Sequence, residues 1–350
     1  MSTIYFNNLT GSNSTGDGSV GNPYKDSGKF SSITPNPGDT INMATPSGSP
    51  YTSTITIPWS GTSGNPITIL ADAMHGCKID GGGSGQLGVD VNEKSYITID
   101  GLVVTGNRWG AVTANGNIGE TASRSAGDSG TGVIFKNLEV YSNGVLNGAE
   151  FGISISGTID SRIQDCIVHD DSVLGAYRVK ACTRPYLTGI TAQNISGDGC
   201  NLLSCTDAVI EYFSIDTYWV EPGSTAHSDG LVLGNVDGVD IRYGAVINFT
   251  QNIYCPQGTS AEYVKNCRIY GNLIYGNNYG DPDNASTGAP GIFFDLTINS
   301  GSYVENVHIF GNTFGYTGLG AIVCNATTPA LSSNIKVYNN IFYKCRGNTT

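Results

Sequence analysis

The stretch Ile163-Gln-Asp-Cys-Ile-Val168 carries a pattern that recurs along the chain: apolar, any, Asn/Asp or small, apolar, any, apolar. Other clear copies are Phe135-Lys-Asn-Leu-Glu-Val140, Val264-Lys-Asn-Cys-Arg-Ile269 and Val337-Tyr-Asn-Asn-Ile-Phe342, and weaker copies begin at Ile99, Leu187, Ile210, Ile241 and Ile309. The copies lie about 23 to 45 residues apart, most often about 23 to 31. A spacing near 23 suits one coil of a parallel β-helix, and such coils bury their apolar faces only by stacking.

A second register supports the same coil. Eight residues before the repeat starts lie Ile155, Val179, Leu202 and Leu233, and two residues earlier lie Ile153, Tyr177, Cys200 and Leu231. Strand alternation turns both rows inward and the residues between them outward. An antiparallel sandwich, the alternative all-β fold, would not keep an offset of eight residues over four coils.

The sequence therefore predicts an all-β fold, a single right-handed parallel β-helix of roughly ten coils with inserted loops. Residues 1–70 are expected to form the amino-terminal strand, a cap and the first coils. Residues 71–350 continue the coils within the same domain. The longest inserted loops are predicted at about 106–131 and 275–290.

Composition excludes several classes of protein. The chain has 350 residues with 48 glycines and only 13% charged residues, which suits many short strands and turns better than long helices. A net charge of −12 without Lys/Arg stripes argues against nucleic acid as a partner. No run of about 18 apolar residues predicts membrane insertion. No signal peptide is visible near Met1, so we expect a processed extracellular protein or one on a virion surface.

The nine cysteines show no CxxC motif and no zinc spacing, so most of them are interpreted as small core residues. Cys182 and Cys205 fall at one register position on adjacent coils. Their Cα atoms are expected about 5 Å apart, within reach of a disulfide in an oxidising compartment.

Residues 4–70 resemble the opening of the pectate-lyase-like right-handed parallel β-helix superfamily, which includes polysaccharide lyases and phage tailspike-type proteins. The resemblance rests on Ile4-Tyr-Phe6, on Gly16-Asp-Gly18 to Asn22-Pro23, on Pro37-Gly-Asp-Thr-Ile41 and on Pro66-Ile-Thr-Ile69. It implies a first strand, a cap and work on polysaccharides. The capping helix of such proteins is weak here, because residues 26–33 show little helical periodicity. The paired-Asp, His-Gly and Arg-Ile-Lys elements of polygalacturonases are absent from the sequence.

Two Asp-Gly pairs, Asp198-Gly199 and Asp229-Gly230, occupy one register on neighbouring coils, with His227 just before the second. Stacked strands would place the two carboxyl groups about 5 Å apart. That spacing suits a retaining glycosidase pair or a calcium site. The alternative is that each Asp-Gly only turns the chain into a strand.

Arg178 and Lys180 lie two residues apart on one predicted strand and face outward, as does Asn201 on the next coil. In a lyase, such a base takes the proton beside a uronate carboxylate while a second cation neutralises that carboxylate. Solvated strand residues are the alternative interpretation. Asp170 and Asp171 are the candidate metal ligands, with Ca²⁺ as the expected ion.

Tyr218, Trp219 and Glu221 lie in the long turn before His227 and are predicted to wall a substrate groove, because sugars pack their C–H faces on aromatic rings. A weaker second set comprises Tyr275, Tyr279, Asp281 and Asp283. For either set, an ordinary surface loop remains the alternative.

Three functions stay open. The favoured one is recognition and cleavage of an extracellular polysaccharide, by a lyase reaction on a uronate-containing glycan rather than by hydrolysis. The second is a non-catalytic glycan-binding tailspike, fibre or adhesin segment. The third is a purely structural solenoid. The sequence shows no carboxy-terminal cap, so we expect that end to be covered by further sequence, by a homotrimer or by another partner chain.

Overall fold

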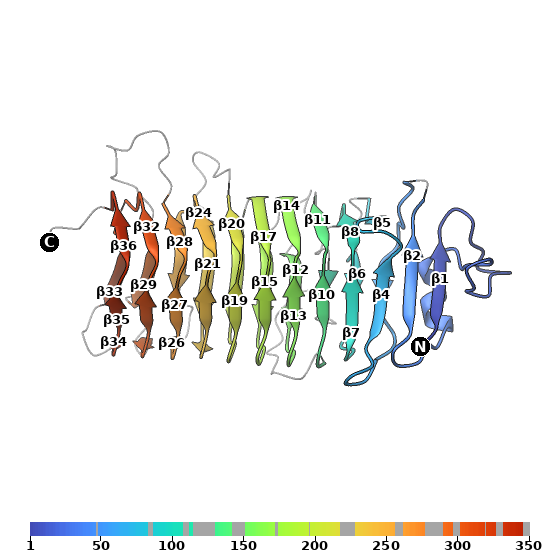
Figure 1. Cartoon of the computed structure of the whole chain (residues 1–350), viewed down its shortest axis with the longest axis horizontal. Helices are drawn as coiled ribbons and strands as arrows, with labels where there is room; N and C mark the ends of the chain where they lie inside the picture. The colour runs from blue at the N-terminus through green and yellow to red at the C-terminus, as the bar shows by residue number, and fades with distance from the viewer. Residues whose placement is uncertain are drawn as a thin grey trace. The chain divides into compact units, whose positions relative to one another are not determined.

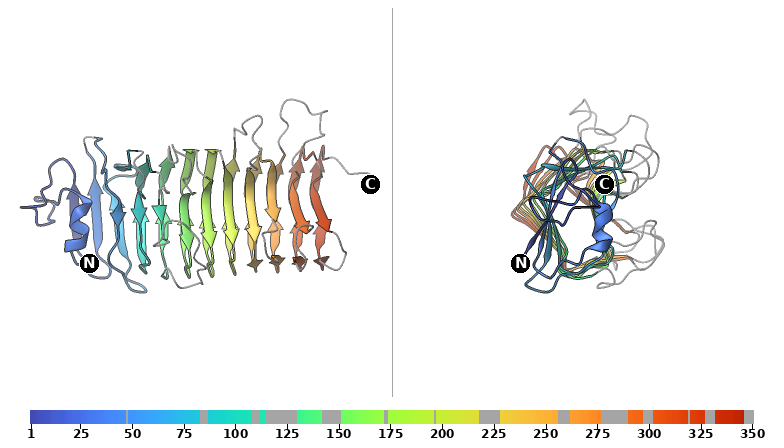
Figure 2. Two further views of the ribbon diagram at one scale, coloured as in Figure 1. Left: turned by 180° about the vertical axis from the view of Figure 1, so that it is seen from behind. Right: turned by 90° about the vertical axis from the view of Figure 1, so that its right-hand side faces the viewer.

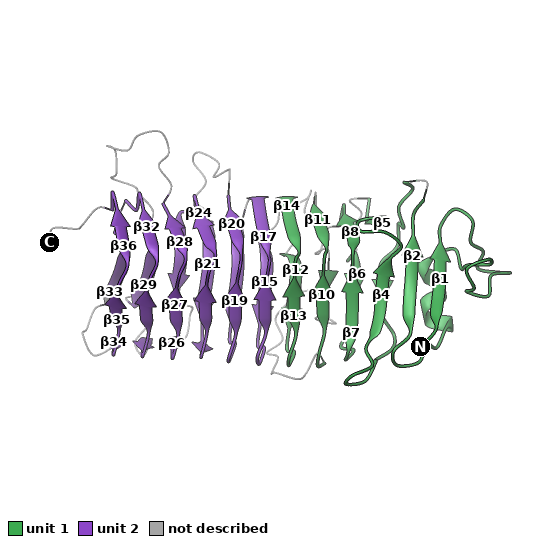
Figure 3. Ribbon diagram, viewed as in Figure 1, with its two compact units in different colours: residues 1–174 green, residues 175–350 purple. Residues whose placement is uncertain are grey.

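The computed structural model of the chain consists almost entirely of short parallel strands joined by turns (Figure 1). It describes residues 1–46, 48–82, 87–107, 112–114, 130–141, 151–171, 174–195, 197–217, 228–255, 262–276, 290–296, 302–318, 320–326 and 332–345. The chain divides into two units, Met1–Leu174 and Gly175–Thr350, which are described separately (Figure 3).

The strands of unit 1 fall into three parallel sheets. Sheet 1 contains β1 (Thr3–Asn7), β2 (Thr40–Ala44), β4 (Ile67–Ala71), β7 (Ile97–Asp100), β10 (Ile134–Lys136) and β13 (Arg162–Gln164). Sheet 2 contains β5 (Cys77–Asp80), β8 (Leu102–Thr105), β11 (Glu139–Tyr141) and β14 (Ile167–Asp171). Sheet 3 contains β3 (Ile55–Thr56), β6 (Val89–Asp90), β9 (Val112–Thr113) and β12 (Phe151–Ser156).

Unit 2 repeats this arrangement, and its sheets are numbered alike. Sheet 1 contains β16 (Tyr186–Thr188), β19 (Val209–Glu211), β23 (Asp240–Arg242), β27 (Arg268–Tyr270), β31 (His308–Phe310) and β35 (Lys336–Tyr338). Sheet 2 contains β17 (Thr191–Ile195), β20 (Ser214–Asp216), β24 (Ala245–Ile247), β28 (Leu273–Tyr275), β32 (Thr313–Gly315) and β36 (Ile341–Tyr343). Sheet 3 contains β15 (Gly175–Lys180), β18 (Asp198–Leu203), β21 (Asp229–Gly234), β25 (Gln251–Cys255), β29 (Ile292–Leu296) and β33 (Ile322–Ala326). A short sheet 4 contains β22 (Val236–Asp237), β26 (Tyr263–Lys265), β30 (Tyr303–Glu305) and β34 (Ser332–Ser333).

The predicted fold class is confirmed: in each unit, the chain visits the sheets in a fixed order and pairs every strand with its equivalent one coil later, as a right-handed parallel β-helix. In sheet 3 of unit 2, Val179 pairs with Leu202 and Leu202 with Leu233, and all three are fully buried. Ile155, in unit 1, is also buried. The inward rows are therefore correct. The predicted boundary at residue 70, between the amino-terminal part and the continuous coils of the same domain, stays a prediction.

A short 3-10 helix, η1 (Ser27–Ser32), lies at the amino-terminal end of unit 1 (Figure 2). The Asp26 side chain caps it by accepting a hydrogen bond from the amide of Gly28 at 2.9 Å. Phe30 of η1 packs its ring against Phe6 of β1 and against Trp59, with centroid distances of 4.9 and 5.1 Å. The weak helical periodicity of residues 26–33 thus corresponds to a single short helix held by one buried ring.

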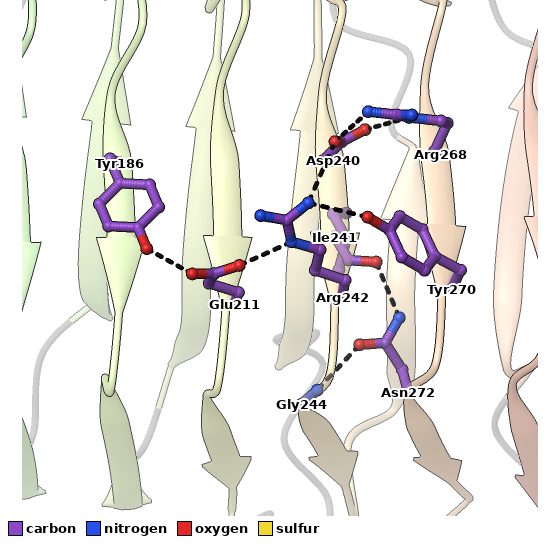
Figure 4. A network of polar contacts seen from close by, with 9 residues as sticks. All are labelled: Tyr186, Glu211, Asp240, Ile241, Arg242, Gly244, Arg268, Tyr270 and Asn272. Atoms are coloured by element: carbon purple, nitrogen blue, oxygen red, sulfur yellow. Dashed lines mark hydrogen bonds and ion pairs between the residues drawn. The ribbon is translucent and has the colours of Figure 1, made fainter.

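Three asparagines form a ladder inside unit 2, at the turn that leads into sheet 2. The side-chain oxygen of Asn312 accepts the amide of Asn272 at 3.0 Å, and that of Asn340 accepts the amide of Asn312 at 2.9 Å. The Asn272 side chain also donates to the carbonyl of Ile241 and accepts the amide of Gly244 (Figure 4). The ladder satisfies buried backbone groups that the turn leaves open.

The last coil that the structure describes exposes its apolar residues. Val337 and Phe342 are 47% and 52% exposed, whereas their partners one coil earlier, Ile309 and Phe314, are completely buried; Ile341 is 63% exposed. Among the described residues, no helix is long and apolar enough to cross a bilayer.

Cys182 and Cys205 lie on adjacent coils of unit 2, as predicted. The amide of Thr206 donates to the Cys182 carbonyl at 3.0 Å, and Thr183 pairs with Thr206. A hydrogen bond with the Cys182 thiol, followed by burial, raises the pKa of the Cys205 thiol well above its ordinary value. Both cysteines are buried.

Candidate functional site

The candidate site lies on the outer face of sheet 3 in unit 2. The sheet places Arg178, Asn201 and Val232 in one row, which continues to Tyr254 and Phe293. A second row contains Gly175, Asp198, Asp229 and Gln251, at or close to the amino ends of their strands. These rows contain most of the predicted site residues that the structure describes.

Local backbone packing explains why the second row faces outward. A Cβ on Gly199 would lie 2.2 Å from the Ile215 side chain, and one on Gly230 would lie 2.2 Å from that of Val246. Both glycines therefore face the core, as do Cys200 and Leu231 directly after them. Two successive inward residues break the strand alternation. Asp198 and Asn201 consequently lie on the same outer side, where the Asn201 amide donates to the Asp198 carboxylate at 3.0 Å.

Asp198 and Asp229, called the carboxylate pair below, touch across neighbouring coils. The backbone amide of Asp229 donates to Oδ1 of Asp198 at 3.0 Å. Asp229 is only 5% exposed. Burial raises the pKa of the Asp229 carboxyl to about 8, and the nearby charge of Asp198 adds to the rise. Asp198, by contrast, accepts two hydrogen bonds that favour its ionised form. The environment of Asp229 therefore suits a general acid, and that of Asp198 suits a base or a nucleophile.

Several buried acceptor atoms surround the carboxylate pair. Oδ1 of Asp229, Oδ1 of Asn201, Oε1 of Gln251 and Oγ of Ser228 are shielded from solvent and have no hydrogen-bond partner within the part of the chain that the structure describes. Buried polar groups are ordinarily satisfied, so such a cluster is a candidate for meeting a ligand. Three of the four atoms accept hydrogen bonds only, which suits hydroxyl groups or a cation.

The two predicted bases lie on β15, one coil before Asp198. Arg178 pairs with Asn201 and Lys180 with Leu203, so both belong to the outer face as expected. Burial lowers the pKa of the Arg178 guanidinium to about 10. Arg178 therefore lies one coil before Asp198 and two coils before Asp229.

Two features of this face were missed by the sequence analysis. The rings of Tyr254 and Phe293 stack along the outward row with centroids 5.8 Å apart. Burial raises the pKa of Tyr254 to about 12, followed by the charges of Asp295 and Asp229. Glu262, which precedes β26, comes close to the same face, since a Cβ on Gly234 would lie 3.2 Å from its carboxylate. The alternation of apolar residues in 251–255 could have predicted that Tyr254 faces outward. No sequence pattern pointed to Glu262.

Other predicted site residues fall elsewhere. His227, Tyr218, Trp219 and Glu221 lie outside the described residues, as do Tyr279, Asp281 and Asp283 of the second set. Tyr275 is the last residue of β28.

The candidate metal ligands lie in unit 1. Asp170 is exposed, and its carboxylate lies 2.9 Å from Nδ1 of His169. The side chain of Asp171 lies outside the described residues. Nε2 of His169 lies 3.2 Å from Glu139, which also pairs with His75. Among the residues that the structure describes, no three His, Cys, Asp or Glu side chains form a group suited to a metal ion.

No protein-family model matches the sequence, and no curated protein is similar to it at a significant level. Solved structures do resemble it. The family 136 lacto-N-biosidase of Eubacterium ramulus superposes with a TM-score of 0.59 and 13% identity, over 98% of this chain and 68% of that enzyme. Pectate lyase Pel9A gives 0.56 and 17%, over 97% and 79% of the two chains. A rhamnogalacturonan lyase gives 0.54 and 12%, over 97% and 87%.

A tailspike of Escherichia coli bacteriophage HK620, solved with a pentasaccharide, gives a TM-score of 0.50 with 13% identity and covers 83% of this chain and 51% of its own. At these identities the likeness concerns the fold. The parallel β-helix fold that the resemblance of residues 4–70 implied is therefore confirmed.

Proposed function

We propose that this chain, as an extracellular or virion-surface protein, binds and cleaves an extracellular polysaccharide on the outer face of sheet 3 in unit 2, with the carboxylate pair as the reacting groups. The observation that carries the proposal is the contact between Asp198 and a buried Asp229 whose pKa is raised to about 8. At neutral pH Asp229 then holds a proton, while the two hydrogen bonds that Asp198 accepts favour its ionised form. That division suits a general acid and a second carboxylate acting on a glycosidic bond.

Hydrolysis is preferred here over the elimination that the sequence alone favoured. An elimination acts on a uronate, whose carboxylate would meet Asp198, and further along this face the charges of Glu262 and Asp295 around Tyr254 would also repel it. A glycan presenting hydroxyl groups would instead donate to the buried acceptors of Asn201 and Gln251. Adjacent strands lie about 4.8 Å apart, close to the carboxyl spacing of about 5–5.5 Å in retaining glycosidases. We therefore expect retention of configuration.

In this mechanism Asp229 protonates the glycosidic oxygen and the Asp198 carboxylate attacks the anomeric carbon. Water then hydrolyses the glycosyl-enzyme, with ionised Asp229 accepting its proton. Arg178 lies one coil away and orients the sugar through its guanidinium. The stacked Tyr254 and Phe293 line the continuation of the same row.

The test is a screen of neutral and uronate polysaccharides with the whole chain, measuring reducing ends and absorbance near 235 nm together. Hydrolysis releases reducing ends without the absorbance of a conjugated double bond. Asp229→Asn and Asp198→Asn are expected to lower turnover at least about 100-fold, the usual contribution of general acid–base catalysis. Asp207→Asn is the matched control, because Asp207 is an exposed carboxylate at another turn. Full activity in both carboxylate-pair variants would overturn the proposal.

The second candidate is an elimination with Arg178 as the base, favoured by the burial that lowers its pKa to about 10. Here Asp198, Asp229, Asn201 and Gln251 would hold Ca²⁺, whose ligands are oxygen atoms and which would neutralise a uronate carboxylate. The pH profile separates the two reactions. Hydrolysis should fall above about pH 8, where Asp229 loses its proton, whereas elimination should rise toward pH 10 and respond to a chelator.

Glycan binding without cleavage, as by a tailspike or adhesin, remains the third proposal and predicts retention of a polymer with no product. An assembly that covers the exposed last coil, as a homotrimer or with a partner chain, is also a proposal. Light scattering of the purified chain measures it directly, and a monomer at all concentrations would refute the trimer.

A further inference from the structure

In unit 2, one residue in the left-handed backbone conformation turns the chain from each strand of sheet 1 into sheet 2. The equivalent positions are Gly189, Tyr212, Tyr243, Gly271, Gly311 and Asn339, with φ between 53° and 68°. Glycine and asparagine adopt this conformation readily, whereas a bulky side chain is strained in it by roughly 1 kcal/mol or more. Tyr212 and Tyr243, on successive coils, are the exceptions.

These two tyrosines are also exposed. Tyr212 is 61% exposed and Tyr243 is 48% exposed, although aromatic rings are ordinarily buried to a large extent. Their rings stack with centroids 5.7 Å apart and an angle of 24° between planes. We call Tyr212 and Tyr243 the tyrosine platform.

Tyr243 has a structural role, because its ring covers a glycine of the next coil, but Tyr212 does not have this role. A Cβ on Gly271 would lie 2.8 Å from the Tyr243 ring, so this ring covers a glycine on the following coil. Tyr96 covers Gly132 in the same way, and it too has a left-handed backbone. Tyr212 has no glycine at the equivalent position of the next coil; it has Tyr243. The only structural result of the strained backbone at Tyr212, among the described contacts, is therefore an exposed ring stacked on Tyr243.

A polar network on the strands of sheet 1 lies beside Tyr243 of the tyrosine platform, and Figure 4 shows this network without the two platform rings. Nε of Arg242 donates to Glu211 at 2.6 Å, and its Nη1 donates to the Tyr270 hydroxyl at 2.8 Å. The Arg242 guanidinium lies 5.8 Å from the centre of the Tyr243 ring, and the edge of Tyr270 meets that ring at 83°. Burial acts to raise the pKa of Glu211, but hydrogen bonds from Tyr186 and Arg242 outweigh it and keep the pKa low.

Within the part of the chain that the structure describes, the charges of this network balance one another. Arg242 pairs with Glu211, and Arg268 pairs with Asp240, so two cations balance two anions. An ionic ligand would therefore gain little here. Two exposed, pre-oriented phenol rings suit the C–H face of an uncharged sugar unit, with the hydroxyl groups of the phenols available for hydrogen bonds.

We propose that the tyrosine platform is a second contact site for the same glycan chain, binding an uncharged sugar unit away from the carboxylate pair. This inference rests on the proposed function. After Tyr212 the chain continues through β20, whose three residues span about 10 Å, to Thr217, and the next residues that the structure describes are Ser228 and Asp229. A polymer crossing sheet 2 would reach both sites, so the platform would add affinity for long chains and little for short ones.

The test uses Asp229→Asn as the parent, so that no polymer is cleaved, and measures retardation in native gels containing hydroxyethylcellulose, xylan, galactomannan or polygalacturonate. Tyr212→Asn is the decisive variant because asparagine suits the left-handed backbone. We expect about two- to twelve-fold weaker retardation by a neutral polymer, the usual range for one aromatic contact, with an unchanged or higher Tm. Tyr243→Asn is the second variant, and Tyr263→Thr, from the Tyr263–Tyr303 stack in sheet 4, is the control.

The outcomes separate the two proposals. Weaker retardation of Tyr212→Asn and Tyr243→Asn, with Tyr263→Thr unchanged, supports the platform. Unchanged retardation in both tyrosine variants, or a lower Tm of Tyr212→Asn with unchanged retardation, overturns it and leaves the proposed function standing. If no polymer retards the parent and the unmodified chain cleaves none, the proposed function fails and the platform falls with it.

Discussion

The carboxyl of Asp229 links the chemistry of the site to the stability of the fold. Its pKa is raised to about 8 in the folded chain, whereas in an unfolded chain it titrates near the ordinary value of about 4. Between these pH values the folded state binds one proton more than the unfolded state. Its contribution to stability is therefore fully present below about pH 4 and is lost as pH rises toward 8.

We predict that Asp229→Asn removes this pH dependence. The amide cannot ionise, so the variant should be more stable than the natural chain at pH 8 and similar to it near pH 4. The difference should grow by at most about 1.4 kcal/mol for each pH unit between them. Thermal or urea unfolding across pH 4–9 measures it, with Asp207→Asn as the control. Parallel curves for the natural chain and Asp229→Asn would contradict the prediction.

Gly230 is a second residue on which the site depends. An added Cβ would lie 2.2 Å from Val246 and 2.4 Å from the carbonyl of Asn252. Because backbone cannot move aside cheaply, we expect Gly230→Ala to lower the free energy of unfolding by at least about 1–3 kcal/mol. Chemical denaturation measures the loss. Gly21→Ala, where a Cβ meets nothing within 4 Å, is the control and should be nearly neutral.

The sequence predicted that Asp198 and Asp229 share a register, but it did not predict that Asp229 is buried and Asp198 is not. Register follows from a repeat that is visible in one chain. Burial depends on which residues of other coils pack around each carboxyl group, and no local sequence pattern encodes that. The platform was missed for a related reason: the left-handed turn positions become visible only once the coils are aligned.

At the scale of strands, β15 and β18 bring two thiols together at their carboxyl ends. We predict that oxidation joins Cys182 and Cys205 in a disulfide, because they occupy equivalent positions on coils about 4.8 Å apart. Closing a loop of this length should stabilise the fold by about 3 kcal/mol. Peptide mapping before and after treatment with oxidised glutathione detects the bond, and the Tm should rise.

The control is Cys205→Ala, which should show no rise in Tm under the same treatment. A mixture of pairings, or persistent free thiols at Cys182 after the protein is unfolded and refolded in oxidant, would argue against the expected pair.

Strand positions were predictable because each coil repeats the same apolar rows, as Leu187, Ile210 and Ile241 do in sheet 1. The short helix η1 was harder to predict, since a single ring, Phe30, stabilises it through contacts with Phe6 and Trp59 far away in the sequence. Sheet 4 was not predicted. Its strand β22 has only two residues, too few for a period to show.

For the molecule as a whole, a stack of coils implies that stability is passed between neighbours and need not be uniform. We predict faster amide hydrogen exchange in β35 and β36 than in β27 and β28 of the same unit. Val337 and Phe342 are half exposed, whereas Ile269 and Ile274 are fully buried. Exchange measured by mass spectrometry tests this, and equal protection of the two coils would show that something covers the last one in solution.

The same architecture explains why fold was predictable and activity was not. Inward rows are mostly apolar because they form the core, and several apolar residue types serve there, so the fold can be shared at 12–17% identity with the lyases and the lacto-N-biosidase. The outer rows are free to differ, and the chemistry depends on a few side chains there.

The coil of β15 to β17 has a further consequence for how such a chain changes over generations. Val179, Leu187 and Ala192 each find their partner 23 residues later, at Leu202, Ile210 and Ile215. A duplication or deletion of 23 codons in this stretch would therefore leave every remaining rung matched. An insertion of any other size would have to be absorbed in a loop. The coil is thus a unit that can be duplicated or lost as a whole, and the length of the protein can evolve by one coil at a time.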